Sequence, residues 1–337
     1  MEPSTDAATS VALSEHGRVI ASRFERFRTP ANYAFYDALA EHMRPLVDHP
    51  CLPMYFEYAI TTNDRGRAAA SRIWHAVAPA RRLRWWRRPR VLDVGCAYGG
   101  FLIAFGEKGA RVTGIEIHEG LLRLAKVNLV ENAVDASLVL GDATTPHPEF
   151  RGRFDLVLAN DVVEHVRNLE AFLANLRSWL TPSGMAYLEI PNGASTAFVQ
   201  KDGHHQLFGI TQLDFPEASA YYERVYAKNA GYDTYNYLDL EGYRRLFRSC
   251  GLTLELLPET LAFVSPEAVL QQVQELEAGL DAGLATVPEP SRELVRERVT
   301  AYLARVKAAP RGSEEEQRQF LLDYGASFWI ALAKPSK

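Results

Sequence analysis

Two short stretches of the chain hold the side chains best suited to chemistry. In "NDVVEHV", Asp161, Glu164 and His165 stand at i, i+3 and i+4, so all three would share one face if a helix begins there. In "DGHHQLFG", the adjacent His204 and His205 lie in a glycine-flanked segment without a hydrophobic period. These residue types could ligate a metal ion, supply a catalytic base, or simply belong to a loop.

The non-metal interpretations have a physical basis of their own. Asp161 and Glu164 have the spacing of a capping box, in which the first side chain satisfies backbone donors at a helix start and the second reaches back. His204 or His205 could take a proton from an acceptor without any metal, provided that its imidazole is neutral at the working pH. The residues alone leave the metal, base and loop interpretations open.

A glycine turn provides a second candidate site. The stretch "VLDVGCAYGG" predicts a strand that runs into a turn and then a helix starting near Gly99. Glycine lets the backbone approach an anion closely, and a helix start favours a carboxylate or phosphate. Glu116, Asp142 and Asp161 close the next three predicted strands, which gathers acids at one sheet edge. A glycine turn followed by an acid about twenty residues later fits a dinucleotide or S-adenosylmethionine.

These groups need an open α/β sheet to position them. From Arg90 to about Thr260, short β-branched apolar runs alternate with amphipathic helical stretches. This pattern predicts a Rossmann-like, doubly wound, mostly parallel sheet of seven strands whose last strand is antiparallel. The predicted strands are 90–95, 111–117, 137–142, 154–161, 185–192, 252–257 and 326–335. Sheets of this kind bind ligands at the carboxyl ends of their strands.

The pattern as a whole resembles the class I S-adenosylmethionine-dependent methyltransferases, over about 90–260 and 326–335. The resemblance rests on Asp93 two residues before Gly95, on "GDA" after the third strand, on "FDLVLANDVVEHV" at the fourth, and on the late final strand. One departure is Ala97, which replaces the middle glycine of the family's G-x-G-x-G turn.

The resemblance implies where the methionine part of S-adenosyl-L-methionine would lie. It would pass along the turn residues Gly95, Cys96, Ala97 and Gly99. Asp93 would lie near its amino group. In related enzymes a helix like the one expected at 54–67 closes over the cofactor, which makes Tyr55 a further candidate.

The resemblance also implies contacts to the nucleoside part. Glu116 would hold the ribose hydroxyls, and Ile117 would pack on the adenine face. Asp142 would accept a hydrogen bond from the adenine amine, while Ala143 would offer its backbone N–H to the ring. Asn160 would line the floor beneath the sulfonium.

Two branches of the family carry an acid-x-x-Glu-His motif that binds a divalent cation: the ubiquinone-biosynthesis O-methyltransferases and the small-RNA 2′-O-methyltransferases. Asp161, Glu164 and His165 match this motif, and His204 or His205 would be the counterpart of a later histidine that completes the site in the RNA enzymes. Carboxylates with imidazole suit Mg²⁺, Mn²⁺ or Fe better than structural zinc. A metal here would hold and acidify a hydroxyl, which implies O-methylation.

Three additions surround the predicted core of 89–260 and 326–337. They are an N-terminal helical region (1–88), a tyrosine-rich insertion (194–237) and a helical cap (261–325). We expect them to enclose a pocket for a small or medium-sized acceptor, with some of the tyrosines lining it. The amphipathic helices of the cap could also pair across a homodimer.

The composition limits the environment and the partners. A chain of 337 residues with 47% apolar residues can bury a sizeable core, and a net charge of −5 gives no general preference for polyanions. Three cysteines are too few for a disulfide framework, which favours the cytoplasm. We find no signal peptide and no apolar run near the ~20 residues of a membrane span. The arginine-rich run 81–90 could bind phosphates, but we predict a solvated connector.

Other function classes make distinct predictions. A nicotinamide oxidoreductase is disfavoured by Asp93, "GDA" and the final strand. A scaffold that has lost catalysis would still bind the cofactor, whereas an RNA methyltransferase is favoured only by the arginine run. Nitrogen or carbon as the methyl acceptor remains open.

Overall fold

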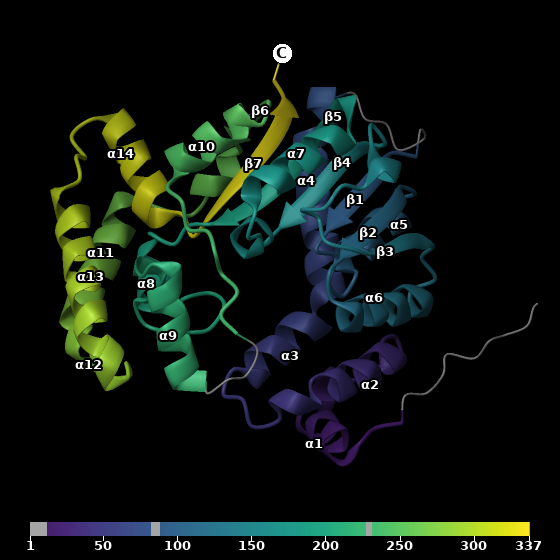
Figure 1. Cartoon of the computed structure of the whole chain (residues 1–337), viewed down its shortest axis with the longest axis horizontal. Coiled ribbons are helices and arrows are strands. Elements are labelled where there is room, and N and C mark those ends of the chain that lie inside the picture. Colours follow the sequence, from purple (N-terminus) through teal and green to yellow (C-terminus); the bar gives the residue numbers. More distant parts are fainter. Residues whose placement is uncertain (1–11, 82–87, 227–230, 337) are drawn as a thin grey trace, which may run out of the picture. The chain divides into compact units, whose positions relative to one another are not determined.

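The computed structural model describes residues 12–81, 88–226 and 231–336. Its seven strands form one sheet in the order β3-β2-β1-β4-β5-β7-β6 (Figure 1). The strands are β1 (Arg90–Val94), β2 (Arg111–Glu116), β3 (Ala136–Leu140), β4 (Phe154–Asn160), β5 (Leu180–Pro191), β6 (Leu252–Leu256) and β7 (Phe328–Pro335). The predicted Rossmann-like fold is therefore confirmed, and β5 begins at Leu180 rather than at Met185.

The pairing of the strands follows from their composition. β1 pairs in parallel with β2 on one side and β4 on the other, with Leu92 opposite Thr113 and Val157. Its apolar residues are buried, as expected for a strand covered on both faces. β7 runs antiparallel to β6, with Leu254 opposite Ala333, as the late final strand predicts.

The chain separates into two compact units. One comprises residues 1–159 and 174–186, and the other comprises 160–173 and 187–337. The helices of the first unit are α1 (Glu15–Arg23), α2 (Tyr33–His42), α3 (Leu52–Ile60), α4 (Thr62–Arg81), α5 (Gly100–Glu107) and α6 (Glu119–Glu131). Helix α7 (Leu169–Trp179) crosses the boundary in sequence. The arginine run predicted to be a connector lies largely outside the described residues.

The N-terminal helices have an aromatic core of their own. The Phe56 ring stacks on Phe24 at a centroid distance of 4.4 Å and meets Tyr36 edge-on at 5.6 Å. The helix expected over 54–67 is two helices, because the chain breaks at Thr61, whose hydroxyl donates to the Glu57 carbonyl oxygen at 2.7 Å. Threonine bonded to the preceding turn in this way competes with continuation of the helix.

Helices α4 and α5 pack closely because glycine lies at their contact. A Cβ atom on Gly66 of α4 would lie 2.5 Å from the Gly100 carbonyl oxygen of α5, which is closer than real Cβ atoms come. We expect Gly66→Ala to lower the free energy of unfolding by ~1–3 kcal/mol, because backbone must move to admit the methyl group. Denaturant unfolding followed by circular dichroism measures this.

Gly106→Ala in α5 is the matched control. Its Cβ would also come within 2.4 Å of an atom, but that atom is the Cγ1 methyl of Val134, at the end of a side chain. A side-chain methyl group is displaced at lower cost than backbone, and alanine gains helix propensity over glycine, so we expect a smaller loss of stability than in Gly66→Ala. Equal losses in the two variants would contradict the assignment of Gly66 to a backbone contact.

The second unit adds helices to strands β6 and β7. They are α8 (Thr196–Gln200), α9 (Phe215–Tyr226), α10 (Leu240–Ser249), α11 (Pro266–Ala278), α12 (Leu280–Ala285), α13 (Glu289–Ala308) and α14 (Glu314–Phe320). Helices α11 and α13 lie side by side, and α9 also contacts α13 (Figure 1). The region between β6 and β7 is thus helical, and its extent as a cap stays a prediction.

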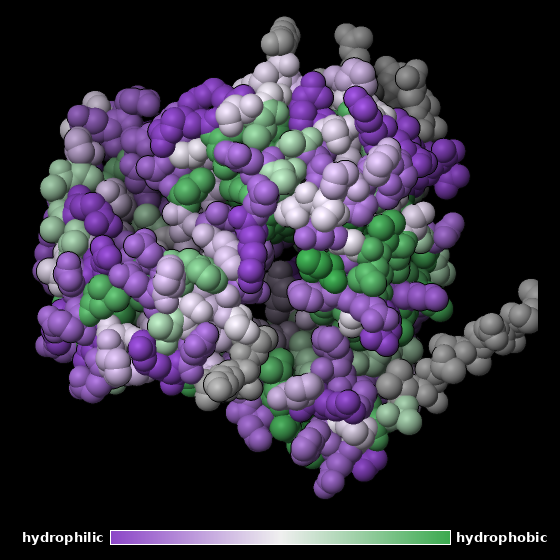
Figure 2. Space-filling view, viewed as in Figure 1, coloured by the Kyte–Doolittle hydropathy of each residue, from purple (hydrophilic) through white to green (hydrophobic). Residues whose placement is uncertain are grey.

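The edge strand β3 carries an apolar surface of the first unit. Apolar side chains gather over β3 and α6, where Val130 and Leu140 are exposed (Figure 2). Val130 and Leu140 line a groove together with Arg123 and Lys126 of α6. Charged side chains beside an edge strand oppose edge-to-edge pairing with another sheet. Within the described ranges, no helix is both long and apolar enough to cross a membrane.

Candidate functional site

The turn after β1 has the backbone of a ligand-binding glycine turn. Gly95, Ala97 and Gly99 have φ values of 64°, 41° and 80°, all in the left-handed region. For Ala97 this conformation costs ~1–2 kcal/mol that glycine would not incur. Helix α5 starts directly after Gly99, so its first-turn amides face the end of β1, where an anionic group is favoured.

Glu116 at the end of β2 fixes this turn. Its Oε2 accepts a hydrogen bond from the Ala97 N–H at 3.0 Å, and its Oε1 accepts one from the His118 N–H at 2.9 Å. The Gly95 N–H donates to the Ile115 carbonyl oxygen at 2.9 Å. The side chain predicted to hold the ribose hydroxyls is therefore buried, oriented and attached to the turn.

Asp93 lies inside the protein at the end of β1. It is 3% exposed, and burial, reinforced by the negative charge of Glu116, raises the pKa of Asp93 to about 8. Two carboxyl groups buried close together favour the presence of a cation, since only then can both ionise at low cost. A ligand ammonium group would supply that charge.

The remaining cofactor candidates of the first unit have different surroundings. Cys96 is buried, and its Sγ packs where a Cβ of Gly114 would otherwise lie. Ile117 is 57% exposed, which leaves an apolar surface for a flat ring. The Asp142 Oδ1 accepts hydrogen bonds from the backbone and hydroxyl of Thr144, both at 2.8 Å.

Ala143 and Tyr55 are the last two cofactor candidates of the first unit. The Ala143 carbonyl oxygen accepts a hydrogen bond from Asn175 Nδ2 at 2.9 Å. Tyr55 lines a cavity of about 390 Å³ together with Tyr58 and Tyr98. Tyr98 belongs to the glycine turn and was not singled out by sequence, because aromatic residues in a turn carry no periodic signal.

The acid motif of the second unit forms a turn and no helix cap. Val163–His165 is a short 3₁₀ helix without a side-chain cap, and Asp161 precedes it with φ 52°. Asn168 accepts a hydrogen bond from the Ala171 N–H at the start of α7 instead. The capping-box interpretation of Asp161 and Glu164 is therefore wrong, and the three motif residues do not share one helical face.

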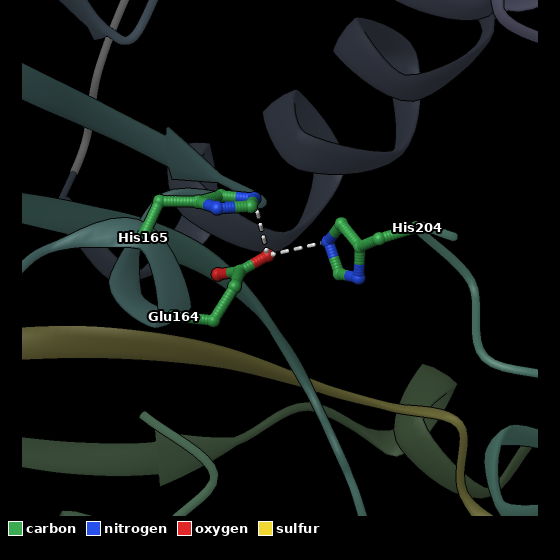
Figure 3. A group of neighbouring side chains, drawn as sticks. All are labelled: Glu164, His165 and His204. Atoms are coloured by element: carbon green, nitrogen blue, oxygen red, sulfur yellow. Dashed lines mark ion pairs between the residues drawn. The ribbon is translucent and has the colours of Figure 1, made fainter. Parts of the chain in front are cut away.

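Glu164, His165 and His204 come together in the second unit. The Glu164 carboxylate is fully buried, and its Oε1 lies 3.6 Å from His165 Nε2 and 3.4 Å from His204 Nε2 (Figure 3). One ligand atom from each residue lies within 4.8 Å of the other two, as in a metal site. Neither Glu164 oxygen has a well-formed hydrogen bond to any described residue. A buried carboxylate in this condition fits a site that binds a cation.

The other predicted metal candidates lie around this group. Asp161 Oδ2 accepts a hydrogen bond from Asn160 Nδ2 at 2.9 Å, and burial, followed by the charge of Glu164, raises the pKa of Asp161 to about 7. His205 Nε2 lies 3.8 Å from Asp233 Oδ1, and its ring meets Tyr222 at 4.7 Å. Asp161 and His205, which were also predicted as metal ligands, do not belong to the group formed by Glu164, His165 and His204.

Residues 231–239 hold the cluster in place, and sequence reasoning missed their role. The backbone N–H of Tyr235 donates to the Glu164 carbonyl oxygen at 2.7 Å. Asn236 Nδ2 donates to the Val166 carbonyl oxygen at 2.6 Å. The Asp233 carbonyl accepts from His165 Nδ1 at 3.2 Å, which leaves His165 Nε2 for Glu164 or a metal.

The electrostatics of the cluster favour a positive charge. Burial lowers the pKa of His165, but its hydrogen bond to Asp233 and the charge of Glu164 outweigh burial and raise it to about 9. Burial likewise opposes protonation of His204, yet the Glu164 carboxylate 3.4 Å from its Nε2 leaves the His204 pKa raised. Protonated imidazoles of His165 and His204 balance the negative charge of Glu164, and a bound divalent cation could replace the protons of these imidazoles.

Comparison with known proteins identifies the chain at this point. The family described as "Methyltransferase domain" matches residues 62–257, more than half of the chain. The chain belongs to this family. This membership agrees with the class I S-adenosylmethionine-dependent methyltransferase that the fold and the glycine turn predicted.

Individual relatives and one solved structure of another protein match parts of this chain. It is 33% identical over 134 residues to the ubiquinone biosynthesis O-methyltransferase of Thiobacillus denitrificans, covering 37% of this chain and 56% of that protein. The corresponding protein of Xanthomonas campestris is 29% identical over 152 residues, or 41% and 64%. The chain thus spans about half the length of such relatives. A putative sarcosine dimethylglycine methyltransferase from Galdieria sulphuraria is 15% identical over 81% of this chain and 84% of that chain, with a TM-score of 0.44.

Proposed function

We propose that this methyltransferase transfers its methyl group to a hydroxyl oxygen of a small or medium-sized acceptor, with a divalent cation held by Glu164, His165 and His204. The observation that carries the proposal is the fully buried Glu164 carboxylate, which lies between two imidazoles without a well-formed hydrogen bond to any described residue. Relatives named as O-methyltransferases support oxygen as the acceptor. One carboxylate with two imidazoles suits Mn²⁺ or Fe²⁺ better than Mg²⁺.

Each residue of the cluster has a defined task in this proposal. A bound divalent cation would lower the pKa of the acceptor hydroxyl and fix its oxygen. Glu164 supplies negative charge, while His204 and His165 supply neutral nitrogen atoms once they have lost their protons. Asp233 orients His165 through the hydrogen bond to Nδ1. Orientation of this kind accounts for much of methyl transfer, because in-line placement supplies ~7–11 kcal/mol.

A metal-free mechanism is the second candidate, and one observation favours it. Burial lowers the pKa of His205 to about 4 despite the nearby charge of Asp202. His205 is therefore neutral at pH 7, as a general base must be, although a pKa this low makes it a weak base. In this alternative, His204 and His165 stay protonated and pair with Glu164.

Metal dependence separates the two mechanisms. We expect formation of S-adenosylhomocysteine with 4-methylcatechol, a probe with two adjacent hydroxyls, to rise at least about tenfold on adding Mn²⁺ and to fall to background with EDTA. This factor corresponds to ~1.4 kcal/mol. The control is 4-methylphenol, whose single hydroxyl cannot chelate. Turnover that is unchanged by EDTA would support the His205 base instead.

A further inference from the structure

The second unit contains a large cavity next to the metal-ligand cluster. Its volume is about 730 Å³, within the ~300–1,000 Å³ typical of small-molecule sites. Residues within 192–194, 211–215 and 232–241 line it, and the last two stretches include the first residues of α9 and α10. Residues of α13, α14, the π-helical turn Leu321–Gly325 and β7 complete the lining. All of these belong to the second unit.

Tyr237 connects this cavity to the cluster. It lines the cavity, and its hydroxyl lies 3.4 Å from His204 Nδ1. Nδ1 is the ring nitrogen of His204 that faces away from Glu164 (Figure 3). A Cβ on Gly193 would lie 2.6 Å from the Tyr237 ring, so glycine makes room for this ring. A molecule in the cavity would therefore lie one side chain away from a predicted metal ligand.

The charged groups of the cavity are mostly acids. Asp214, Asp239 and Asp323 line it and form no ion pair with any described residue. Glu241 also lines it but pairs with Arg248 at 2.7 Å.

One cation lines the cavity, and others lie close by, among them Arg167, whose guanidinium lies 4.8 Å from the centroid of the Tyr235 ring. Among the described lining residues Arg305 is the only cation, and it donates to Gln212 Oε1 at 3.2 Å. The cavity therefore carries an excess of negative charge.

An aromatic wall faces the same space. Phe215 lies 4.7 Å from Tyr235 and 5.9 Å from Tyr232, measured between ring centroids, and all three line the cavity. Thr234 between the two tyrosines is 3% exposed, and its hydroxyl has no well-formed hydrogen bond to any described residue. Aromatic faces beside carboxylates bind organic cations, through cation–π attraction of ~0.5–2 kcal/mol in addition to the ion pair.

We propose that this cavity binds the methyl acceptor and that the acceptor carries a protonated amine. The proposal rests on the proposed function for the hydroxyl that receives the methyl group. The amine would pair with Asp214 and Asp323, and the acceptor's apolar part would lie against Phe215. The hydroxyl would then extend past Tyr237 toward the cluster.

Three matched probes test the charge preference without any turnover. Dopamine, 4-methylcatechol and 3,4-dihydroxyphenylacetate share the catechol ring and differ in carrying a positive, neutral or negative substituent. Ligand-observed NMR titrations of the whole chain in EDTA give their affinities. We expect dopamine to bind at least about tenfold more tightly than the acid, a difference of ~1.4 kcal/mol. Equal affinities, or tighter binding of the acid, would overturn the proposal.

Variants locate the effect in this cavity. Asp214→Asn with Asp323→Asn should lower dopamine affinity to that of 4-methylcatechol and leave 4-methylcatechol unchanged. Asp214→Asn alone, on an exposed loop position, should reduce the tenfold preference for dopamine over the acid to roughly threefold, which is half of it in free energy. The matched control Asp281→Asn removes an exposed acid of α12 that pairs with Arg296.

An equal loss in the control would show only nonspecific attraction of a cation to an acidic protein, and would overturn the proposal. The titrations contain neither metal nor S-adenosylmethionine. A failure of metal-assisted transfer and a failure of amine recognition are therefore seen in separate experiments.

Discussion

Glu164→Gln is expected to lower kcat/KM for 4-methylcatechol by about 100- to 1,000-fold, as loss of one charge-stabilising group does in other active sites. The substitution keeps the shape of the side chain and removes its negative charge between His165 and His204. Affinity for Mn²⁺, measured by isothermal titration calorimetry at pH 8, should fall by at least about tenfold. The affinity for S-adenosylhomocysteine should stay within about twofold.

The control for this variant is Glu170→Gln, an exposed glutamate in the first turn of α7. It should change none of these quantities. In Glu164→Gln, both imidazoles lose a carboxylate that favours their protonated forms, so their pKa values fall and they become neutral rather than remaining as buried charges. Unfolding at pH 8 checks that the fold survives. Full activity in a folded Glu164→Gln protein would contradict the proposed role of the cluster.

Asp93→Asn is expected to have opposite effects on cofactor binding and on stability. Loss of a charge-assisted hydrogen bond to the ammonium group of S-adenosylmethionine, worth ~1.5–3 kcal/mol, should weaken binding about 10- to 100-fold. Without cofactor, the variant should become more stable relative to wild type as the pH rises. The folded-state pKa of Asp93 is about 8, well above the unfolded value of ~4. The folded protein thus binds the extra proton between these values, and wild-type stability falls as pH rises through that window.

Proton release provides a direct readout of the same group. At pH 7 the wild-type protein should release up to about one proton on binding S-adenosylmethionine, because the ligand's cation favours ionised Asp93. Calorimetry in buffers of different ionisation enthalpy measures this number, and Asp93→Asn should release none. Asp135→Asn, an exposed acid before β3, is the matched control. Tight cofactor binding by Asp93→Asn would contradict the predicted contact.

The strands could be predicted because each is a short apolar run next to a helical period, and such runs are buried in a parallel sheet. The break at Thr61 could not be predicted, because the sequence there continues a helical pattern and a single hydroxyl bond interrupts it. Likewise, Ala97 takes the backbone conformation of the glycine that it replaces. The surrounding turn, tied to Glu116, enforces a conformation that alanine itself disfavours.

The cluster was predicted in part, for reasons of sequence distance. Glu164 and His165 are adjacent and recognisable as a motif, and His204 was one of two alternatives. Asp233 and Asn236 could not be assigned, because they lie in coil with no periodicity, about seventy residues after the turn that they hold. The prediction that Asp161 shares a helical face with Glu164 and His165 was wrong. Asp161 has a left-handed backbone conformation, and a short 3₁₀ helix follows it where an α-helix was expected to begin.

A crystal structure of the protein with S-adenosylhomocysteine and Mn²⁺ tests the central claim most directly, through the anomalous signal of the metal. The account predicts a peak about 2.0–2.3 Å from Glu164, His165 and His204. It also predicts that His205 remains beside Asp233 and away from the metal. A map with no peak at the cluster, and with the imidazoles still paired to Glu164, would contradict the metal site and leave His205 as the base.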